Sequence, residues 1–380
     1  MSKIKVGVVG YGTIGKRVAD AIILQDDMEL VGITANSYNY KIKTASKKGV
    51  KIFPTRGLPD KDHLNHGIDS VHGHAEDLIE QSDIIVDCTP KKTGYKQWYE
   101  KRGVKAIFQG GEKADIGTSF VSQCNYADAW GADYIRVVSC NTTGLCRTLQ
   151  AIDSAYGIRE VHATLIRRAA DPWDIYHGPV NALVPHLVVP SHHGPDVKTI
   201  LPNMDLFTTS ISVPTTLMHM HSISVDLEIP TVSVEEVADL FKSTARVRMV
   251  YNSDGIRSTA EILEYGKDLG RERGDMPEVC VWKETMGIQK DKLFYMQAIH
   301  QESDVVPENI DAIRAACKEA RRLAKLGKKT VIWSYFRWNI EYLGKYLLKD
   351  LKFKYLEFAW RIFLFIFFYS YYCMEPSAIL

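Results

Sequence analysis

Apolar and polar positions in the N-terminal part of the chain alternate between strand-like and helix-like patterns. Lys3 to Gly10 (KIKVGVVG) is a β-branched apolar run that ends in glycine, which predicts a buried strand of a parallel sheet. Lys16 to Leu24 has helical spacing, and Glu29 to Thr34 (ELVGIT) returns to a strand pattern. The helix is expected to bury one apolar face, made of Val18, Ala19, Ile22 and Ile23. Residues 3 to 34 therefore predict one βαβ unit.

The periodicity changes at Cys140. Before this residue, further apolar runs predict buried strands at Asp83 to Asp87, Val104 to Phe108 and Tyr134 to Val138. After it, Glu160 to Arg168 and Thr216 to Leu227 are long stretches in which apolar and polar residues alternate. Such alternation is typical of a sheet with one covered face. The chain therefore predicts two domains of different kinds.

A glycine motif joins the first predicted strand to the first predicted helix. Gly10-Tyr11-Gly12-Thr13-Ile14-Gly15 has the GxGxxG spacing, in the context that dinucleotide binding requires. Gly10 permits the tight turn, Gly12 lets the backbone approach a pyrophosphate, and Gly15 lets the helix pack closely on the strand. The helix N-terminus then faces the negative phosphates. The motif predicts an α/β protein with a Rossmann-type, doubly wound dinucleotide-binding domain.

The residues at the end of the second predicted strand affect the choice between NAD and NADP. NAD-specific domains usually carry an Asp or Glu about 20 residues after the motif, but here the strand ends in Thr34-Ala35-Asn36-Ser37. This segment has no acid to repel a 2′-phosphate, and Lys41 and Lys43 follow closely. Lysines in a loop are more often simply solvated. The sequence therefore allows NADP as well as NAD.

The chain of 380 residues is long enough for two domains, since single hydrophobic cores stop growing at about 250 to 300 residues. We expect residues 1–139 to form the dinucleotide-binding domain and residues 140–303 to form an α+β catalytic domain with a mixed or antiparallel sheet. Residues 304–327 predict a helix, with Pro307 near its first turn, that packs back on the first domain. Residues 328–380 are an atypical hydrophobic tail.

The tail contains an uncharged run, Ile362 to Met374, that is dense in Phe and Tyr. This run is shorter than the roughly 20 apolar residues of a membrane-spanning helix. Two interpretations stay open: a hydrophobic segment that docks on this or another protein, and an anomalous terminus.

Composition narrows the class of ligand and the compartment. Lys and Arg number 47 against 46 Asp and Glu, so the net charge is +1 and no strong field favours nucleic acid or an anionic membrane. Seven cysteines without a CxxC pair fit a reducing compartment better than a disulfide framework. The sequence runs from Met1 into a strand pattern with no signal peptide pattern. We expect a cytoplasmic protein with small-molecule partners, and neither nucleic acid nor a membrane.

Ser139-Cys140-Asn141-Thr142-Thr143-Gly144 is the most informative stretch, because a predicted strand ends and a predicted helix begins there. Cys140 therefore lies at a helix N-terminus. The partial positive charge at that position favours a thiolate, which predicts a pKa below the free value of about 8.5. A buried structural cysteine is the usual alternative for a single Cys, but the flanking residues favour a nucleophile.

Two histidines are candidates to serve this nucleophile. His219 and His221 belong to Leu217-Met218-His219-Met220-His221, where strand alternation points both the same way. One is expected to take a proton and the other to pack or hydrogen-bond beside it. A zinc site that includes His192 and His193 is the competing interpretation, but no third ligand stands at a telling spacing, so no metal is predicted.

Two further segments offer donors suited to phosphate. Arg167 and Arg168 end a predicted strand, and Ser191-His192-His193-Gly194 is predicted to lie in a loop. Guanidinium groups bind phosphate through paired hydrogen bonds. Adjacent arginines more often form surface ion pairs. These residues therefore indicate a phosphate site only in combination with Cys140.

Five segments together resemble archaeal-type (type II) phosphorylating glyceraldehyde-3-phosphate dehydrogenase. They are GYGTIGKRVADAI, FQGGEKA, SCNTTGLCR, LMHMH and HQESDVVPENIDAIRA, and the likeness covers roughly residues 3 to 320. SCNTTGLCR is highly specific, whereas GxGxxG alone is weak. The resemblance implies a homotetramer whose chains pair a Rossmann-type domain with a catalytic domain. Family chains end not far beyond the helix that follows HQESD, so the tail departs from the pattern.

Residue by residue, the resemblance makes Cys140 the nucleophile and His219 the base, and it selects His219 over His221. Thr13 and Ile14 would contact the dinucleotide at its phosphate turn. Further cofactor contacts are implied at Gly110, Gly111, Arg168 and Gln301. Substrate contacts are implied at Ser139, Cys140, Asn141, His193 and Gly194, and Arg167 is the further phosphate donor.

The implied reaction is oxidation of D-glyceraldehyde 3-phosphate by NAD or NADP with inorganic phosphate, which gives 1,3-bisphosphoglycerate in glycolysis and gluconeogenesis. Attack by Cys140 would give a thiohemiacetal and then a thioester. Two alternatives stay open. A semialdehyde dehydrogenase, of the aspartate-semialdehyde or N-acetyl-glutamyl-phosphate type, would use the same chemistry on another substrate. A dinucleotide-binding regulatory protein without turnover would not need a reactive cysteine.

Overall fold

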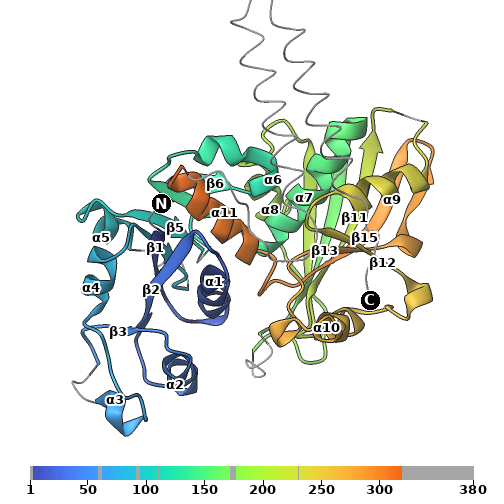
Figure 1. The fold of residues 1–380 in the computed structure, drawn as a ribbon. Coiled ribbons are helices and arrows are strands. Elements are labelled where there is room, and N and C mark those ends of the chain that lie inside the picture. Colours follow the sequence, from blue (N-terminus) through green and yellow to red (C-terminus); the bar gives the residue numbers. More distant parts are fainter. Residues whose placement is uncertain are drawn as a thin grey trace, which may run out of the picture. The chain divides into compact units, whose positions relative to one another are not determined.

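The computed structural model describes residues 3–58, 62–90, 95–109, 111–171, 177–229 and 231–318. Met1–Val331 is one compact unit, and its described part contains two β-sheets (Figure 1). No helix in these ranges is long and apolar enough to cross a membrane. The predicted tail, 328–380, lies outside the described residues.

The first sheet has seven strands, and all of its pairings are parallel. Its order is β3-β2-β1-β4-β5-β7-β6. The strands are β1 (Ile4–Val9), β2 (Met28–Ala35), β3 (Ile52–Pro54), β4 (Ile84–Asp87), β5 (Lys105–Phe108), β6 (Thr118–Phe120) and β7 (Tyr134–Val137). The order runs outward in both directions from the junction of β1 and β4, as in doubly wound nucleotide-binding sheets. The predicted Rossmann-type fold is therefore confirmed.

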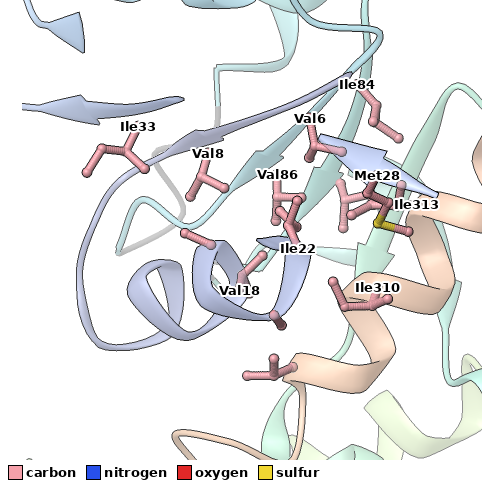
Figure 2. Packing of buried hydrophobic residues seen from close by; sticks show 14 of the residues in the cluster. Val6, Val8, Val18, Ile22, Met28, Ile33, Ile84, Val86, Ile310 and Ile313 are labelled. Atoms are coloured by element: carbon pink, nitrogen blue, oxygen red, sulfur yellow. The ribbon is translucent and has the colours of Figure 1, made fainter. Parts of the chain in front are cut away.

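The core of this part lies between the sheet and two helices, α1 (Thr13–Ile23) and α11 (Val306–Ala316). Figure 2 shows side chains of β1 and β4, among them Val6 and Val86, facing Ile22 of α1 and Ile310 of α11. The remaining helices are α2 (Tyr40–Lys47), α3 (Asp62–Asn65), α4 (Ala75–Glu80), α5 (Lys96–Glu100), α6 (Ser122–Asn125) and the short 3₁₀ turns η1 (Ala114–Ile116) and η2 (Tyr126–Ala129). Helix α11 thus comes from the far end of the described chain and completes the first core.

Two predictions about these helices need correction. Helix α1 begins at Thr13 rather than Lys16, and Ile23 is 55% exposed instead of buried. Ile23 is the last residue of α1 and points about 140° away from Val18 around a helix of 3.6 residues per turn. Helix α11 begins at Val306 rather than residue 304, with Pro307 in its first turn as predicted, and it ends at Ala316 because Lys318 adopts a left-handed conformation with φ 57°. Residues 319–327 of that prediction lie outside the described residues.

The second sheet is mixed, as predicted, with the order β12-β13-β15-β11-β8-β10-β9 and with β14 paired to β15. Its strands are β8 (Ile158–Arg168), β9 (Val184–Pro185), β10 (Leu206–Val213), β11 (His219–Leu227), β12 (Val247–Val250), β13 (Val279–Trp282), β14 (Gly287–Gln289) and β15 (Lys292–Ile299). The associated helices are α7 (Cys140–Tyr156), α8 (His193–Lys198), α9 (Val234–Ser243), α10 (Thr259–Asp268), η3 (Asn252–Asp254), η4 (Glu272–Gly274) and η5 (Lys283–Thr285). Buried residues alternate along β11, and α7 and α9 contribute to the core on that face.

Candidate active site

The glycine motif forms the turn from β1 into α1. Gly10 has φ +88°, and a Cβ there would lie 3.0 Å from the backbone of Cys88 and Thr89. A Cβ on Gly15 would lie 2.0 Å from the carbonyl oxygen of Gly10, so the helix packs directly on the turn. A Cβ on Gly12 would meet nothing within 4 Å. The motif therefore combines a tight turn and close packing with an open backbone edge, which fits the approach of a dinucleotide pyrophosphate.

The end of β2 carries no acidic side chain, and Lys41 of α2, which follows it, lies within the field of other cations. Thr34 Oγ1 accepts a 2.9 Å hydrogen bond from the N–H of Gly10, whereas Asn36 is exposed. Burial, and then the neighbouring charges of Arg17, Arg273 and Lys41, lower the pKa of Lys16 to about 8. Of the two lysines singled out from the sequence, Lys41 therefore belongs to this group of cations.

The other lysine lies elsewhere. The Nζ atom of Lys43 would be 2.9 Å from a Cβ placed on Gly67, so this side chain extends toward the turn that follows α3. Lys43 is therefore a suitable comparison for Lys41 in experiments on dinucleotide selectivity.

Cys140 is the first residue of α7, and a polar cluster holds this turn. The Ser139 side chain caps the helix by accepting from the N–H of Thr142 at 3.3 Å. Thr142 Oγ1 donates to Asp196 at 2.7 Å, and Arg136 pairs with the same carboxylate at 2.7 Å. The predicted placement of the cysteine at a helix N-terminus is confirmed.

The predicted direction of the Cys140 pKa shift is wrong. Burial raises the pKa of the thiol above its ordinary value, and the charge of Asp304 raises it further. Arg168, the backbone N–H of Asn141 and Arg167 lower it without reversing the shift. Desolvation of the thiolate thus outweighs the favourable field of the helix terminus. Formation of the thiolate needs a proton acceptor.

The structure connects the cysteine turn to both groups of histidines singled out from the sequence. Asn141 Oδ1 lies 2.9 Å from Nε2 of His221, and Asn141 Nδ2 lies 3.4 Å from Nε2 of His193. His219 and His221 both point to the covered face of β11, as predicted. The alternation begins at His219 rather than Thr216, because Met218 has a left-handed φ of 63°. His193 starts α8 instead of lying in a loop.

All of these rings are buried, and burial favours their neutral forms. It lowers the pKa of His193 to about 2, with help from the charges of His192 and Arg167, and it lowers the pKa of His221 to about 3. The pKa of His219 is also well below its ordinary value, first through burial and then through Arg168 and Arg167. Each ring is therefore uncharged at neutral pH.

The two adjacent arginines have different environments. Arg168 pairs with Glu302 at 2.7 Å and also with Asp171, and its backbone N–H donates to Nδ1 of His219 at 3.1 Å. The Nε atom of Arg167 is buried and has no hydrogen-bond partner among the residues that the structure describes. Arg167 is thus a partly unsatisfied cation close enough to affect the pKa values of Cys140, His193 and His219.

The other residues implied as cofactor contacts lie on connecting segments. Both side-chain polar atoms of Gln301 are buried without a partner in the described part of the chain, which fits an amide that awaits a polar ligand group. Gly111 has φ +84°, with open space where its Cβ would be. Gly110 lies outside the described residues. Gly194 donates its N–H to Thr208 Oγ1 at 3.1 Å, so this donor is already used internally.

Several residues near the site were not identified from the sequence. Glu302 contacts Nε2 of His300 at 2.8 Å. Although burial opposes its ionisation, His300, Arg168 and Arg17 lower the pKa of Glu302 to about 2. Gln297 bonds to His221 at 3.2 Å. The sequence signals for these residues were the HQESD motif, which contains His300 and Glu302, and the place of Gln297 on the strand just before it.

Among the described residues, no group of three or more His, Cys, Asp or Glu side chains is arranged to hold a metal ion. His192 and His193 lie ring to ring, with centroids 3.9 Å apart. The ring nitrogens of His193 and His221 are engaged with Asn141, Ser191 and Gln297.

A parallel nucleotide-binding sheet, a mixed sheet and a cysteine at the first turn of the helix between them define a class: dinucleotide-dependent aldehyde dehydrogenases that form a thioester. Residues 139–302 match the family described as glyceraldehyde 3-phosphate dehydrogenase, C-terminal domain. The chain belongs to the glyceraldehyde-3-phosphate dehydrogenase family. Enzymes of this family use a nicotinamide dinucleotide.

Relatives named glyceraldehyde-3-phosphate dehydrogenase are similar over most of their length. The protein from Methanococcoides burtonii is 50% identical over 341 residues, which cover 87% of this chain and 99% of the relative. The protein from Methanothermobacter thermautotrophicus is 51% identical over 318 residues, covering 82% and 93%. The protein from Pyrococcus furiosus is 50% identical over 331 residues, covering 86% and 97%. The resemblance stated from the motifs is confirmed.

Proposed function

We propose that this chain oxidises D-glyceraldehyde 3-phosphate to 1,3-bisphosphoglycerate with inorganic phosphate and NAD or NADP. The observation that carries the proposal is the junction of Cys140, at the start of α7, with the buried His221 of β11 through Asn141. Relatives at about 50% identity carry the name of this enzyme. This makes the semialdehyde dehydrogenases and a non-catalytic regulatory protein the weaker alternatives.

In the proposed reaction, the Cys140 sulfur attacks the aldehyde carbon and forms a C–S bond, which leaves negative charge on the oxygen. The backbone N–H of Asn141, which lies beside the Cys140 sulfur, suits that charge. A bound nicotinamide dinucleotide supplies the hydride acceptor. Loss of the hydride leaves a thioester on Cys140, and inorganic phosphate then attacks the carbonyl carbon and releases the thiolate. Loss of the hydride thus takes the carbon from the aldehyde to the carboxylic acid oxidation level while the dinucleotide is reduced, and the proton that the Cys140 thiol loses passes to a base.

His219 is the proposed partner of Cys140, with the base role that the resemblance assigns. In the arrangement of the structure its Nδ1 accepts the N–H of Arg168, so a neutral ring holds its proton on Nε2. This tautomer donates a hydrogen bond to the thiohemiacetal oxygen. To take up a proton at Nε2, the ring must first release the bond from Arg168 and change tautomer. We therefore propose both functions and distinguish them by experiment below.

The residues proposed to hold the dinucleotide are Gly10, Gly12, Thr13, Ile14, Gly15, Gly110, Gly111, Arg168 and Gln301. Those proposed to hold the substrate are Ser139, Cys140, Asn141, Arg167, His193 and Gly194. Because the His193 ring is neutral and Gly194 is internally bonded, we assign the charge that meets the substrate phosphate to Arg167.

We also propose that the chain forms two domains, a dinucleotide-binding domain of residues 1–139, completed by α11, and a catalytic domain of residues 140–303. We further propose that the protein is cytoplasmic.

We further propose that the chain assembles with copies of itself, as a homotetramer. Large apolar side chains are exposed along the segment from Val180 to Val189, where Leu187 is 90% exposed. The others are Val180, Leu183, Val184, Val188 and Val189. Contiguous exposed apolar surface of this kind marks protein contacts. If Leu187→Ser with Val188→Ser leaves the mass by light scattering at that of the wild type, this segment is not the contact.

The test of the activity is the initial rate of NADP and NAD reduction by purified protein with glyceraldehyde 3-phosphate, with and without inorganic phosphate. A rate that depends on phosphate supports the proposal, and aspartate semialdehyde serves as the competing substrate. Cys140→Ser should abolish turnover while dinucleotide affinity stays near that of the wild type. Turnover of the semialdehyde alone, or full activity of Cys140→Ser, would refute the assignment.

A further inference from the structure

A continuous hydrogen-bond chain runs beneath the cysteine turn through six side chains. In order, they are Gln297, His221, Asn141, His193, Ser191 and Thr208. The successive distances are 3.2, 2.9, 3.4, 3.2 and 2.9 Å. Every member is buried, with at most 3% of its surface exposed. The chain therefore links β15, β11, α7, α8 and β10 in an environment without bulk water.

Backbone carbonyl groups at the two ends fix the direction of the chain. At one end, Gln297 Nε2 donates to the carbonyl of Gly144 at 3.1 Å, so its second proton points to Nδ1 of His221. At the other end, Thr208 Oγ1 donates to the carbonyl of Ser191 at 3.0 Å, so it accepts from the Ser191 hydroxyl. A carbonyl oxygen accepts only, and each hydroxyl has one proton to donate. Both ends thus require that each group donates to the next in the direction from Gln297 to Thr208.

This polarity determines the proton of each ring. His221 accepts at Nδ1 from Gln297 and donates from Nε2 to Asn141 Oδ1. Asn141 Nδ2 donates to Nε2 of His193, whose Nδ1 donates to Ser191 Oγ. Both rings are neutral, with opposite tautomers, and neither has a free nitrogen with which to exchange a proton with substrate. His221 is therefore not a base in this arrangement.

The hydrogen-bond chain joins two segments that have roles in the proposed function. Asn141 follows the nucleophile directly, and His193 and Gly194 belong to the segment expected to hold substrate. Thr208 Oγ1 also accepts from the N–H of Gly194 at 3.1 Å, and Thr148 Oγ1 donates to Gln297 Oε1 at 2.9 Å. The oxygen of the Asn141 amide is bonded to His221 and its nitrogen to His193. These two bonds leave a single orientation for this side chain.

We infer that His221 and Gln297 are positioning residues, which act through the Asn141 amide to hold the Cys140 turn in register with the His193–Gly194 segment. The inference rests on the proposed function. A shift of about 1 Å in a reacting group costs on the order of 100-fold in rate. A break in the chain should therefore reduce turnover although neither residue touches the reacting atoms.

The test compares variants that interrupt this series of hydrogen bonds with a variant that keeps the hydrogen-bond donor at position 221. His221→Leu removes both ring contacts, whereas His221→Gln keeps an N–H near the position of Nε2 but has no titratable ring. Gln297→Met interrupts the chain at a residue remote from Cys140, and it carries the test if His221→Leu does not fold. His162→Gln is the matched control, because His162 is an exposed histidine on the neighbouring strand β8.

We expect His221→Leu and Gln297→Met to lower kcat/KM for glyceraldehyde 3-phosphate by roughly 10- to 100-fold, with an unchanged Kd for the dinucleotide. His221→Gln should recover most of the loss, and its rate should keep the pH profile of the wild type. Equal impairment of His221→Gln and His221→Leu would show that the ring itself reacts, and would overturn the inference. Wild-type rates in His221→Leu and Gln297→Met would overturn it as well.

Alkylation of Cys140 by iodoacetamide, followed by mass spectrometry of its peptide, provides a readout that does not depend on turnover. The N–H of Asn141 favours the Cys140 thiolate, so loosening of Asn141 should slow alkylation several-fold in His221→Leu and Gln297→Met but not in His221→Gln. If the wild type oxidises no aldehyde, the proposed function fails while this series still decides the positioning role. Identical alkylation rates in all variants would refute it.

Discussion

The backbone N–H of Arg168 donates a 3.1 Å hydrogen bond to Nδ1 of His219. The guanidinium group of the same arginine is held by Glu302 and Asp171, so the residue that fixes the ring is itself anchored at both ends. The bond places the proton of neutral His219 on Nε2. His221 has the same tautomer, but its Nε2 is bonded to Asn141, whereas Nε2 of His219 has no hydrogen-bond partner among the described residues. His219 is thus the histidine whose ring remains available to a ligand.

The first prediction separates hydrogen-bond donation by His219 from general-base catalysis. His219→Gln keeps an N–H near the position of Nε2 but cannot take a proton, and His219→Ala removes both. If donation dominates, His219→Ala should lower kcat by about 10² to 10³, the usual loss for one oxyanion donor, with His219→Gln much closer to the wild type. If the base role dominates, both variants should lose about 10² to 10⁴. Single-turnover NADP reduction in a stopped-flow instrument measures the step concerned.

The second prediction concerns stability in mild acid. Burial depresses the pKa values of His193, His219 and His221 in the folded protein, whereas unfolded histidines bind protons below about pH 6.5. The unfolded state therefore binds more protons, so the free energy of unfolding falls as the pH decreases below 6.5. Each ring contributes up to about 1.4 kcal/mol per pH unit. Urea unfolding at pH 7.5, 6.5 and 5.5 measures the slope.

His221→Gln serves as the control for this prediction, because it removes one of the three rings without adding a titratable group. Its stability should depend on pH less steeply than that of the wild type, by about one proton. A wild-type free energy of unfolding that is constant between pH 7.5 and 5.5 would contradict the assignment of neutral rings.

Features that depend on neighbours in the sequence were predicted well. The strand β1, the turn at Gly10 and the close packing of α1 on that turn follow from one local pattern, since Gly10 and Gly15 each have a separate steric reason to be there. The change from continuous apolar runs to alternation at Cys140 anticipated the parallel and mixed sheets. The common face of His219 and His221 followed from strand geometry alone.

Features that depend on partners distant in the sequence were missed. The sequence could not separate His219 from His221 by alternation, because their difference arises from Arg168 and Asn141, which are 51 and 80 residues away. The pKa of Cys140 was misjudged for the same reason: the helix terminus is visible in the sequence, but burial and the approach of Asp304 are not. Tertiary contacts therefore set the protonation of the site, although local patterns set its location.

The third prediction tests the assignment of the substrate phosphate to Arg167. This arginine has a buried Nε without a partner in the described part of the chain, so an anion would satisfy a donor already in place. Arg167→Leu should raise KM for glyceraldehyde 3-phosphate by roughly 10- to 100-fold, as expected for a charged hydrogen bond worth about 1.5 to 3 kcal/mol. KM for unphosphorylated glyceraldehyde should change little. An equal effect on both aldehydes would assign Arg167 to the reacting centre instead.

The fourth prediction concerns the choice between NADP and NAD. Lys41 of α2 contributes to the positive field around Lys16 of α1, and Asn36 is exposed where NAD-specific domains place an acid. Asn36→Asp should therefore raise KM for NADP by at least about tenfold, because a carboxylate repels a 2′-phosphate. KM for NAD should stay the same or fall.

Lys41→Ala should weaken the binding of NADP but not that of NAD. Lys43→Ala is the matched control, since Lys43 extends toward Gly67, and initial rates with each dinucleotide measure the selectivity. Equal changes for NAD and NADP in Asn36→Asp, or a larger effect of Lys43→Ala than of Lys41→Ala, would place the 2′-phosphate elsewhere.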